Sequence, residues 1–289
     1  MATRSSGEER AGWLLAAPPA VYAVLLLAAP LATVLVFSVL TGGRNVVDLP
    51  FTLDNYLKVF TQPVYRAVML RSLAVSFMVT AVTVMLAYPI AYFVSFAVTP
   101  SRKSLWLFLI TIPFWTSYII RVALWRTILG YDGIIDSVVM GLGLSSGQLN
   151  ILANGVTSIV ITLSHAYAPF AVLPIFVALE KVDRSLLEAG QDLGESRFLT
   201  FLRVTLPLSM PGVIAAVLIV FIPVVGDYVT PALVGGGKVP MIANLIEIEM
   251  LKKLDQAMGS AIATAAMLIV GVVSVVFVLL NRRFIGGRS

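Results

Sequence analysis

Six runs of apolar residues, separated by short polar connections, dominate the hydropathy pattern of the sequence. Crossing a hydrocarbon core of about 30 Å takes roughly 20 helical residues, and most of these runs reach that length. The pattern therefore predicts an all-α integral membrane protein with about six transmembrane helices. The helices are expected over residues 12–40, 72–98, 104–120, 151–179, 208–225 and 259–280.

The ends of two runs carry further information. The first run contains no charged residue and is longer than the apolar region of a signal peptide, so we expect an uncleaved first helix. The third run stops at Arg121. The pattern leaves open whether residues 122–129 extend the third helix or form a separate element.

Composition agrees with a membrane protein, because 59% of the residues are hydrophobic and only 12% are charged. A soluble domain carries about twice that share of charge. The chain has no cysteine, which excludes disulfides, thiolate metal sites and cysteine nucleophiles, and we expect no metal site. We attribute the net charge of +5 to charge bias in the loops, and expect no binding of nucleic acid.

The basic residues are distributed unevenly between the two sides of the expected bundle. One side holds both termini, the loop at Arg102 and Lys103, and the segment 180–205. Lys and Arg exceed Asp and Glu by four on this side and by one on the other, which together make the net charge of +5. Cytoplasmic loops carry the excess of Lys and Arg, so both termini are expected in the cytoplasm.

The segment between the fourth and fifth expected helices, residues 182–212, mixes charged and apolar residues. Asp183 or Ser185 is suited to begin a helix, and Glu188 follows Ser185 at the spacing of a capping box. Gly194 is expected to interrupt this helix before a second amphipathic turn. The segment predicts a helix–turn–helix at the membrane face, and two interpretations stay open. It is either a connector embedded in lipid headgroups or a docking surface for a cytosolic partner.

The residues and spacing of this segment resemble the EAA loop of ABC import permeases. The family pattern is Glu-Ala-Ala, three residues, Gly, nine residues, Ile, any residue, and Leu-Pro. The matching positions here are Glu188, Ala189, Gly190, Gly194, Val204, Leu206 and Pro207. The chain departs from the pattern at Gly190, which replaces Ala, and at Val204, which replaces Ile. The resemblance implies that this is a cytoplasmic coupling loop that contacts the ATPase.

Other stretches resemble the permeases of spermidine/putrescine importers, and in particular the first of their two paired permeases. They are residues 52–56, 112–116, 179–183, 226–231, 235–237 and 241–246. The resemblance implies a type I permease domain at 67–282, after an N-terminal tail, first helix and external loop at 1–66. A cytoplasmic tail at 283–289 follows. It also implies a location in the bacterial inner membrane and import of a small cationic solute such as a polyamine. Related permeases for opines, aminoethylphosphonate and other small solutes share much of the pattern, so those substrates stay open.

The resemblance further implies a set of partners. They are a second permease subunit, two copies of a cytosolic ATPase, an extracytoplasmic solute-binding protein and membrane lipid. We expect no enzyme activity in this chain, because its only Gly-Lys pair, Gly237-Lys238, is followed by Val239. A phosphate-binding P-loop needs Ser or Thr at that position. ATP and Mg²⁺ are therefore expected in the ATPase, and no cofactor in this chain.

A proton- or sodium-coupled secondary transporter is the rival class. Such carriers place ionisable groups in mid-membrane, whereas His165 is the only titratable side chain deep within an expected span. A lone histidine on an apolar helix is more often a hydrogen-bonded packing residue than a proton relay. The pattern therefore favours the ABC permease.

Four residues are candidates for a path that carries a cationic solute. Carboxylates and aromatic faces hold ammonium groups by charge and by cation–π attraction, and Asp227, Tyr228, Trp115 and Tyr118 have this chemistry. The aromatic residues are equally typical of the belt at the headgroup level. Asp227 has an alternative as a solvated carboxylate at the end of a loop.

Overall fold

The computed structural model describes residues 6–43, 46–145, 147, 149, 151 and 154–285. The chain divides into two compact units. The first contains the described residues up to Gln62 together with Ile246–Ala265, and the second contains the described residues of Pro63–Leu245 and those from Ala266 onward. Both units are predominantly helical, as the apolar runs predicted.

The first unit begins with the long helix α1 (Ser6–Ser38), followed by strands β1 (Leu40–Gly43) and β2 (Val46–Phe51) and by helix α2 (Asp54–Thr61). The two strands form an antiparallel pair, which the apolar runs did not predict. The first helix was expected to reach residue 40 but ends at Ser38. The Tyr56 hydroxyl donates to Ser38 Oγ at 2.6 Å, so α2 is tied to the end of α1.

The first unit also contains the end of α12 (Ile242–Glu247), the π-helical turn η4 (Ile248–Lys252) and the start of α13 (Gln256–Leu280). An ion pair of 2.7 Å joins Lys253 and Glu249 across one turn.

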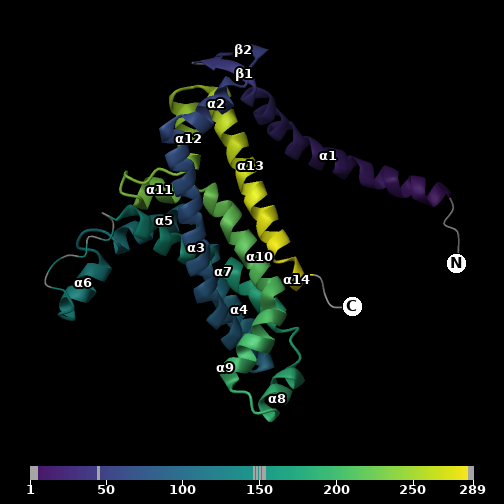
Figure 1. The fold of residues 1–289 in the computed structure, drawn as a ribbon, viewed down its shortest axis with the longest axis vertical. Coiled ribbons are helices and arrows are strands. Elements are labelled where there is room, and N and C mark those ends of the chain that lie inside the picture. Colours follow the sequence, from purple (N-terminus) through teal and green to yellow (C-terminus); the bar gives the residue numbers. More distant parts are fainter. Residues whose placement is uncertain are drawn as a thin grey trace. The chain divides into compact units, whose positions relative to one another are not determined.

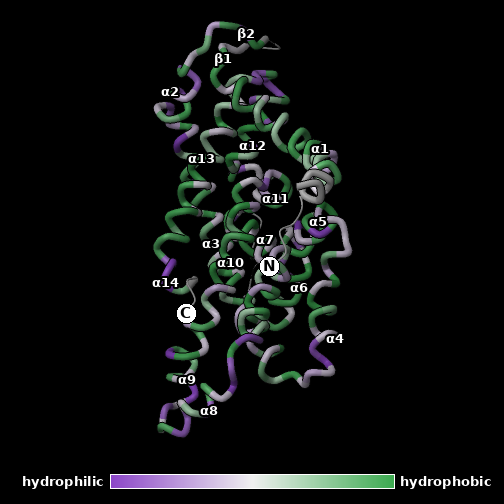
Figure 2. The backbone as a smooth tube through the Cα atoms, turned by 90° about the vertical axis from the view of Figure 1, so that its right-hand side faces the viewer, coloured by the Kyte–Doolittle hydropathy of each residue, from purple (hydrophilic) through white to green (hydrophobic). Residues whose placement is uncertain are grey.

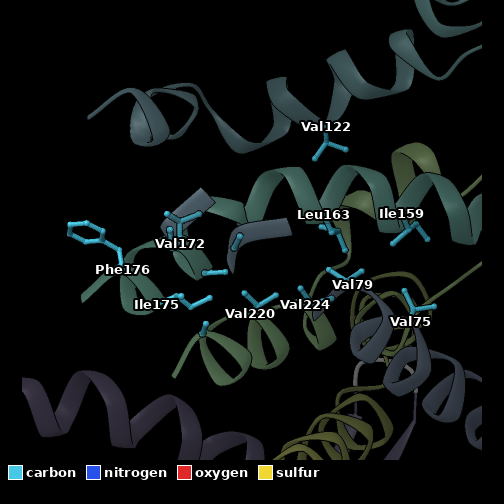
Figure 3. Packing of buried hydrophobic residues seen from close by; sticks show 14 of the residues in the cluster. Val75, Val79, Val122, Ile159, Leu163, Val172, Ile175, Phe176, Val220 and Val224 are labelled. Atoms are coloured by element: carbon cyan, nitrogen blue, oxygen red, sulfur yellow. The ribbon is translucent and has the colours of Figure 1, made fainter. Parts of the chain in front are cut away.

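The second unit is built around three helices: α3 (Pro63–Phe96), α7 (Gly155–Leu179) and α10 (Leu206–Val225). They run side by side (Figure 1), and their facing side chains form the buried core. Figure 3 shows Val79, Leu163 and Val224 meeting from these three helices, while Val122 approaches α7 from another helix. The buried side chains account for one apolar face of each long helix. Other apolar residues of these helices, such as Phe77, Val177 and Ile222, are exposed, so the runs are apolar on more than one face.

A small residue allows two of these helices to approach closely. A Cβ atom added at Gly212 of α10 would lie 2.5 Å from the Pro174 carbonyl oxygen of α7. Membrane helices commonly meet through small residues, because lipid gives no hydrophobic drive and close backbone contact supplies the attraction.

The third expected helix, residues 104–120, is wrong as a straight span. The chain forms α4 (Pro100–Thr111) and a 3₁₀ turn, η1 (Ile112–Trp115), then bends by 87° into α5 (Tyr118–Ile128). Arg121 does not end the helix but lies inside α5 and is 9% exposed. Residues 122–128 therefore belong to the same helix as Tyr118, and Pro113 at the start of the 3₁₀ turn helps to explain the break, because proline removes a helix donor.

Short helices complete the second unit. They are α6 (Ile134–Gly141), α8 (Arg184–Asp192), α9 (Arg197–Thr200), the π-helical turn η3 (Phe201–Thr205), α11 (Val229–Val234) and α14 (Arg282–Ile285). Figure 2 shows hydrophobic residues along α3, α7 and α10, and hydrophilic residues gathered around α8 and α9. Within the described part of the chain, five helices are long and apolar enough to cross a membrane, or six if the bent pair is one span.

Candidate functional site: a coupling segment and a polar cluster at a broken span

The segment between α7 and α10 folds as the helix–turn–helix that its sequence predicted. Helix α8 begins after Asp183, whose carboxylate accepts from the Ser185 backbone N–H at 2.9 Å. The hydrogen bond from the Ser185 backbone and, after it, one from the Ser185 side chain hold the pKa of Asp183 below its usual value. Asp183 is thus the N-cap, and the expected capping box of Ser185 with Glu188 is wrong, because Ser185 lies inside α8.

Gly194 sits where α8 turns toward α9. Its φ of +85° lies in the left-handed region, and a Cβ added there would meet no heavy atom within 4 Å. The residue is therefore required by backbone conformation, not by crowding, because L side chains strongly disfavour positive φ.

Gly190 stands where the family pattern has Ala, and its surroundings give a reason. A Cβ at this position would lie 3.2 Å from Thr200 Cγ2. That distance is short for two carbon atoms, so alanine would require the Thr200 side chain to shift. The close approach of α8 to Thr200 explains why the smaller residue fits.

The outer face of the segment is exposed. Glu188 and Ala189 are exposed and α8 has no buried residue. Three apolar side chains accompany them: Leu193 is 86% exposed, Phe198 68% and Leu186 47%. Leu206 and Pro207 are half-buried and begin α10, as expected for the entry to the fifth helix. The segment thus presents an apolar surface with a carboxylate beside it.

The second group of candidates lies at the break between η1 and α5. The Tyr118 hydroxyl donates to Asp227 Oδ2 at 2.8 Å and lies 2.7 Å from Thr230 Oγ1. Asp227 Oδ1 accepts from the backbone N–H groups of Val229 and Thr230 at 3.1 and 3.4 Å, at the start of α11. Asp227 is only 7% exposed, so the solvated-loop alternative is wrong.

The other two aromatic candidates are not part of this cluster. Trp115 is 76% exposed and its ring packs edge-on against Phe108 at 5.5 Å. Tyr228 is 51% exposed, and its carbonyl accepts from Asn244 Nδ2 at 2.8 Å. The structure therefore brings Tyr118 and Asp227 together and leaves the side chains of Trp115 and Tyr228 on the surface.

Arg121 is a member of the cluster that the sequence did not single out. Its guanidinium carbon lies 5.0 Å from the centre of the Phe114 ring and 5.9 Å from that of Tyr118. Its Nε and Nη1 atoms are buried and have no hydrogen-bond partner among the described residues. An arginine inside an apolar run is unusual, and this could have indicated a functional role for Arg121. From the sequence alone, Arg121 was instead interpreted as the end of a helix.

His165 behaves as a hydrogen-bonded packing residue. Its Nδ1 accepts from the indole N–H of Trp125 at 3.2 Å, and the two rings meet at 5.4 Å. It is not the only titratable side chain in a span, because Arg121 is a second one.

Comparison with known proteins places the chain in a family. The chain belongs to the family described as the binding-protein-dependent transport system inner membrane component, whose model matches residues 14–286. It is a multi-pass membrane permease of that family.

Among individual relatives, the chain is 36% identical to the spermidine/putrescine transport system permease protein PotB of Haemophilus influenzae, over 88% of this chain and 90% of that protein. It is 34% identical to PotB of Escherichia coli K12, over 80% of this chain and 83% of that one. The fold is similar to that of a chain of a bacterial alginate ABC transporter, crystallised with an alginate pentasaccharide-bound periplasmic protein. That match has a TM-score of 0.73 at 16% identity and covers 97% of this chain and 98% of the other.

Proposed function

We propose that this chain is one permease subunit of an ABC importer for a small cationic solute, a polyamine such as spermidine or putrescine. The observation that carries the substrate class is the buried Asp227 carboxylate, held by Tyr118 at the break of a bent span. The similarity to two spermidine/putrescine permeases supports the same class.

A buried carboxylate at this position suits a cationic solute that has lost its hydration water. Interrupted membrane helices expose backbone and side-chain polar groups in mid-membrane, where transporters place their substrate sites. Asp227 would pair with one ammonium group of the solute, and the rings of Phe114 and Tyr118 already accommodate the Arg121 cation at 5.0 and 5.9 Å. Cation–π contacts of this kind strengthen when the cation is desolvated.

Energy would arrive from a separate ATPase, in which ATP and Mg²⁺ bind. The exposed Glu188 and the apolar residues Leu193 and Phe198 would dock on that protein, with the carboxylate adding specificity. The end of the second unit that carries α8 and α9 would then face the cytoplasm, with both chain termini. A second permease, two ATPase copies and an extracytoplasmic binding protein complete the proposed complex.

A second candidate substrate is a solute that carries an anionic group beside its ammonium group. Arg121 favours it, because its buried Nε and Nη1 have no partner among the described residues. Such a guanidinium next to the path would repel a pure polycation and attract a carboxylate or phosphonate. An opine or an aminoalkylphosphonate has this chemistry.

Competition of uptake distinguishes the two substrates. Cells or proteoliposomes with the full complex take up labelled putrescine while unlabelled spermidine, an opine or aminoethylphosphonate is added. The polyamine proposal expects competition by spermidine only, and Arg121→Gln should not raise the KM for putrescine. If only the zwitterionic solutes are transported, and Arg121→Gln raises their KM at normal protein level, the second candidate replaces the first.

A further inference from the structure

Three helix ends meet at one carboxylate in the second unit. Glu180 follows the last residue of α7, and its two oxygens accept from Lys103 Nζ at 2.6 and 2.8 Å. Oε1 also accepts from the Ser95 hydroxyl at 2.5 Å. Lys103 lies in the first turn of α4 and Ser95 in the last turn of α3, so Glu180 links the ends of α3, α4 and α7.

Helix α8 is attached to the same point. Arg184, its first residue, donates from Nη2 to the Ser95 carbonyl oxygen at 3.1 Å. Its guanidinium also lies 5.8 Å from the centre of the Phe96 ring. Ser95 therefore serves both sides, since its hydroxyl donates to Glu180 and its carbonyl accepts from Arg184. We name Ser95, Lys103, Glu180 and Arg184 the helix-end junction.

The junction is partly enclosed, although Arg184 itself is exposed. Ser95 is 1% exposed, the Lys103 side chain 13% and the Glu180 side chain 35%. Partial burial opposes the charged carboxylate, but hydrogen bonds from Lys103 and Ser95 and the charges of Lys103 and Arg184 outweigh it and lower the pKa of Glu180. Glu180 is thus ionised at neutral pH, and its bonds to the junction are charge-assisted and directional.

The rest of α8 approaches Thr200 of α9 closely at Gly190, but a cleft separates it from the end of α3. A cleft of about 280 Å³ lies between the end of α3, which contributes Tyr92 and Phe96, and α8, which contributes Leu187 and Gln191. A helix over a cleft cannot pass a displacement to the bundle through close side-chain packing at that face. The junction at its first turn is the direct polar link between α8 and the ends of α3, α4 and α7.

We propose that Glu180 is a positioning residue for energy coupling, which makes the ends of α3, α4 and α7 follow the movement of α8. The inference rests on the proposed function, in which α8 docks on the ATPase. A partner protein can shift a transporter between two states only through contacts that differ between those states. The Glu180 carboxylate holds the ends of α3, α4 and α7 and, through Ser95, the first turn of α8. It therefore converts one docking movement of α8 into a joint movement of the bundle.

The test measures solute imported per ATP hydrolysed, in proteoliposomes that contain the complete complex. Glu180→Gln keeps the size and an acceptor oxygen but removes the charge, and Lys103→Gln removes the opposite charge. Lys181→Gln is the matched control, because Lys181 is exposed and its side chain has no hydrogen bond or ion pair among the described residues. Coupling between sites commonly amounts to factors of about 5 to 150, so both junction variants should lower import per ATP about tenfold. The control should match the wild type.

Glu180→Asp keeps the carboxylate that Lys103 and Ser95 bind and should retain more of the import per ATP than Glu180→Gln. A residue that only stabilises the fold would change the amount of complex, not this ratio. The proposal is overturned if the Gln variants keep the wild-type ratio, if Glu180→Asp assembles but does no better than Glu180→Gln, or if all variants fail to assemble. If the wild-type complex imports solute without ATP hydrolysis, the proposed function itself fails, whatever the variants do.

Discussion

Replacing Asp227 with Asn tests the proposed cation site most directly, because the change removes one charge at nearly constant size. The structure indicates that the fold should tolerate it. Asn keeps Oδ1, which accepts from Val229 and Thr230, and the Tyr118 hydroxyl has Thr230 Oγ1 as a second partner at 2.7 Å. The loss in stability is the difference between a charge-assisted and a neutral hydrogen bond, about 1 kcal/mol.

The effect on transport should be much larger. Asp227 is 7% exposed, so an ammonium group that pairs with it would be desolvated. Losing one partner of a buried charge pair costs roughly 2–5 kcal/mol, which corresponds to a loss of about 30-fold to a few thousandfold in kcat/KM. A charge on the rim would cost much less, since solvent screens it.

The assay is uptake of labelled putrescine and spermidine, with the membrane level of the permease measured in parallel. Asp54→Asn is the matched control, because Asp54 is an exposed carboxylate in the first turn of α2. Tyr118→Phe should give a smaller loss than Asp227→Asn, since it removes only the hydroxyl donor. Unchanged kinetics of Asp227→Asn at normal protein level would contradict a cation site at Asp227 and leave this residue as a structural cap of α11.

Three further predictions concern the other end of the second unit and the orientation of the chain. Glu188→Lys and Gly194→Arg should each abolish uptake and weaken recovery of the ATPase with the permease, whereas Gly194→Asn, which tolerates positive φ, should keep most activity. Normal transport by both disruptive variants would reduce the segment to a membrane connector. In this cysteine-free chain, a Cys introduced at Ser196 should resist a membrane-impermeant thiol reagent added outside intact spheroplasts. A Cys at Gly43 should react, and an added Cβ there meets no heavy atom within 4 Å. The reverse pattern would invert the proposed topology. The stabilisation of the wild type over Glu180→Gln should be full at neutral pH and decline below about pH 4.5, because a lowered pKa gives stability that is lost on protonation. A difference in Tm that does not change with pH would contradict this.

The apolar runs were sufficient to predict the long helices, since a segment that crosses lipid must satisfy its backbone internally and expose apolar side chains. The helix–turn–helix between α7 and α10 was equally predictable from the sequence. Its Gly194 and Pro207 are local requirements of the backbone, and they show in the sequence as residue types at fixed spacing. The capping box was misassigned, because Asp183 and Ser185 both suit an N-cap and only the backbone geometry selects Asp183.

The break between η1 and α5 could not be read from hydropathy, because both halves of the bent pair are apolar and only Pro113 and the residues around it hint at a turn. The position of Arg121 was misjudged for the same reason. A charge inside an apolar run either ends a helix or lies buried in one, and the choice depends on aromatic rings contributed by η1 and α5 at the bend.

The class of the protein, most of its spans and the segment that carries the family pattern follow from the sequence, because they depend on local composition and spacing. Which polar residues act together is a property of the packed helices. Asp227 and Tyr118 are 109 residues apart, and Glu180 and Ser95 are 85 apart, so their pairing follows from how the helices pack. Burial, which sets the strength of each of these polar contacts, is likewise a property of the packed bundle and is not encoded at any single position.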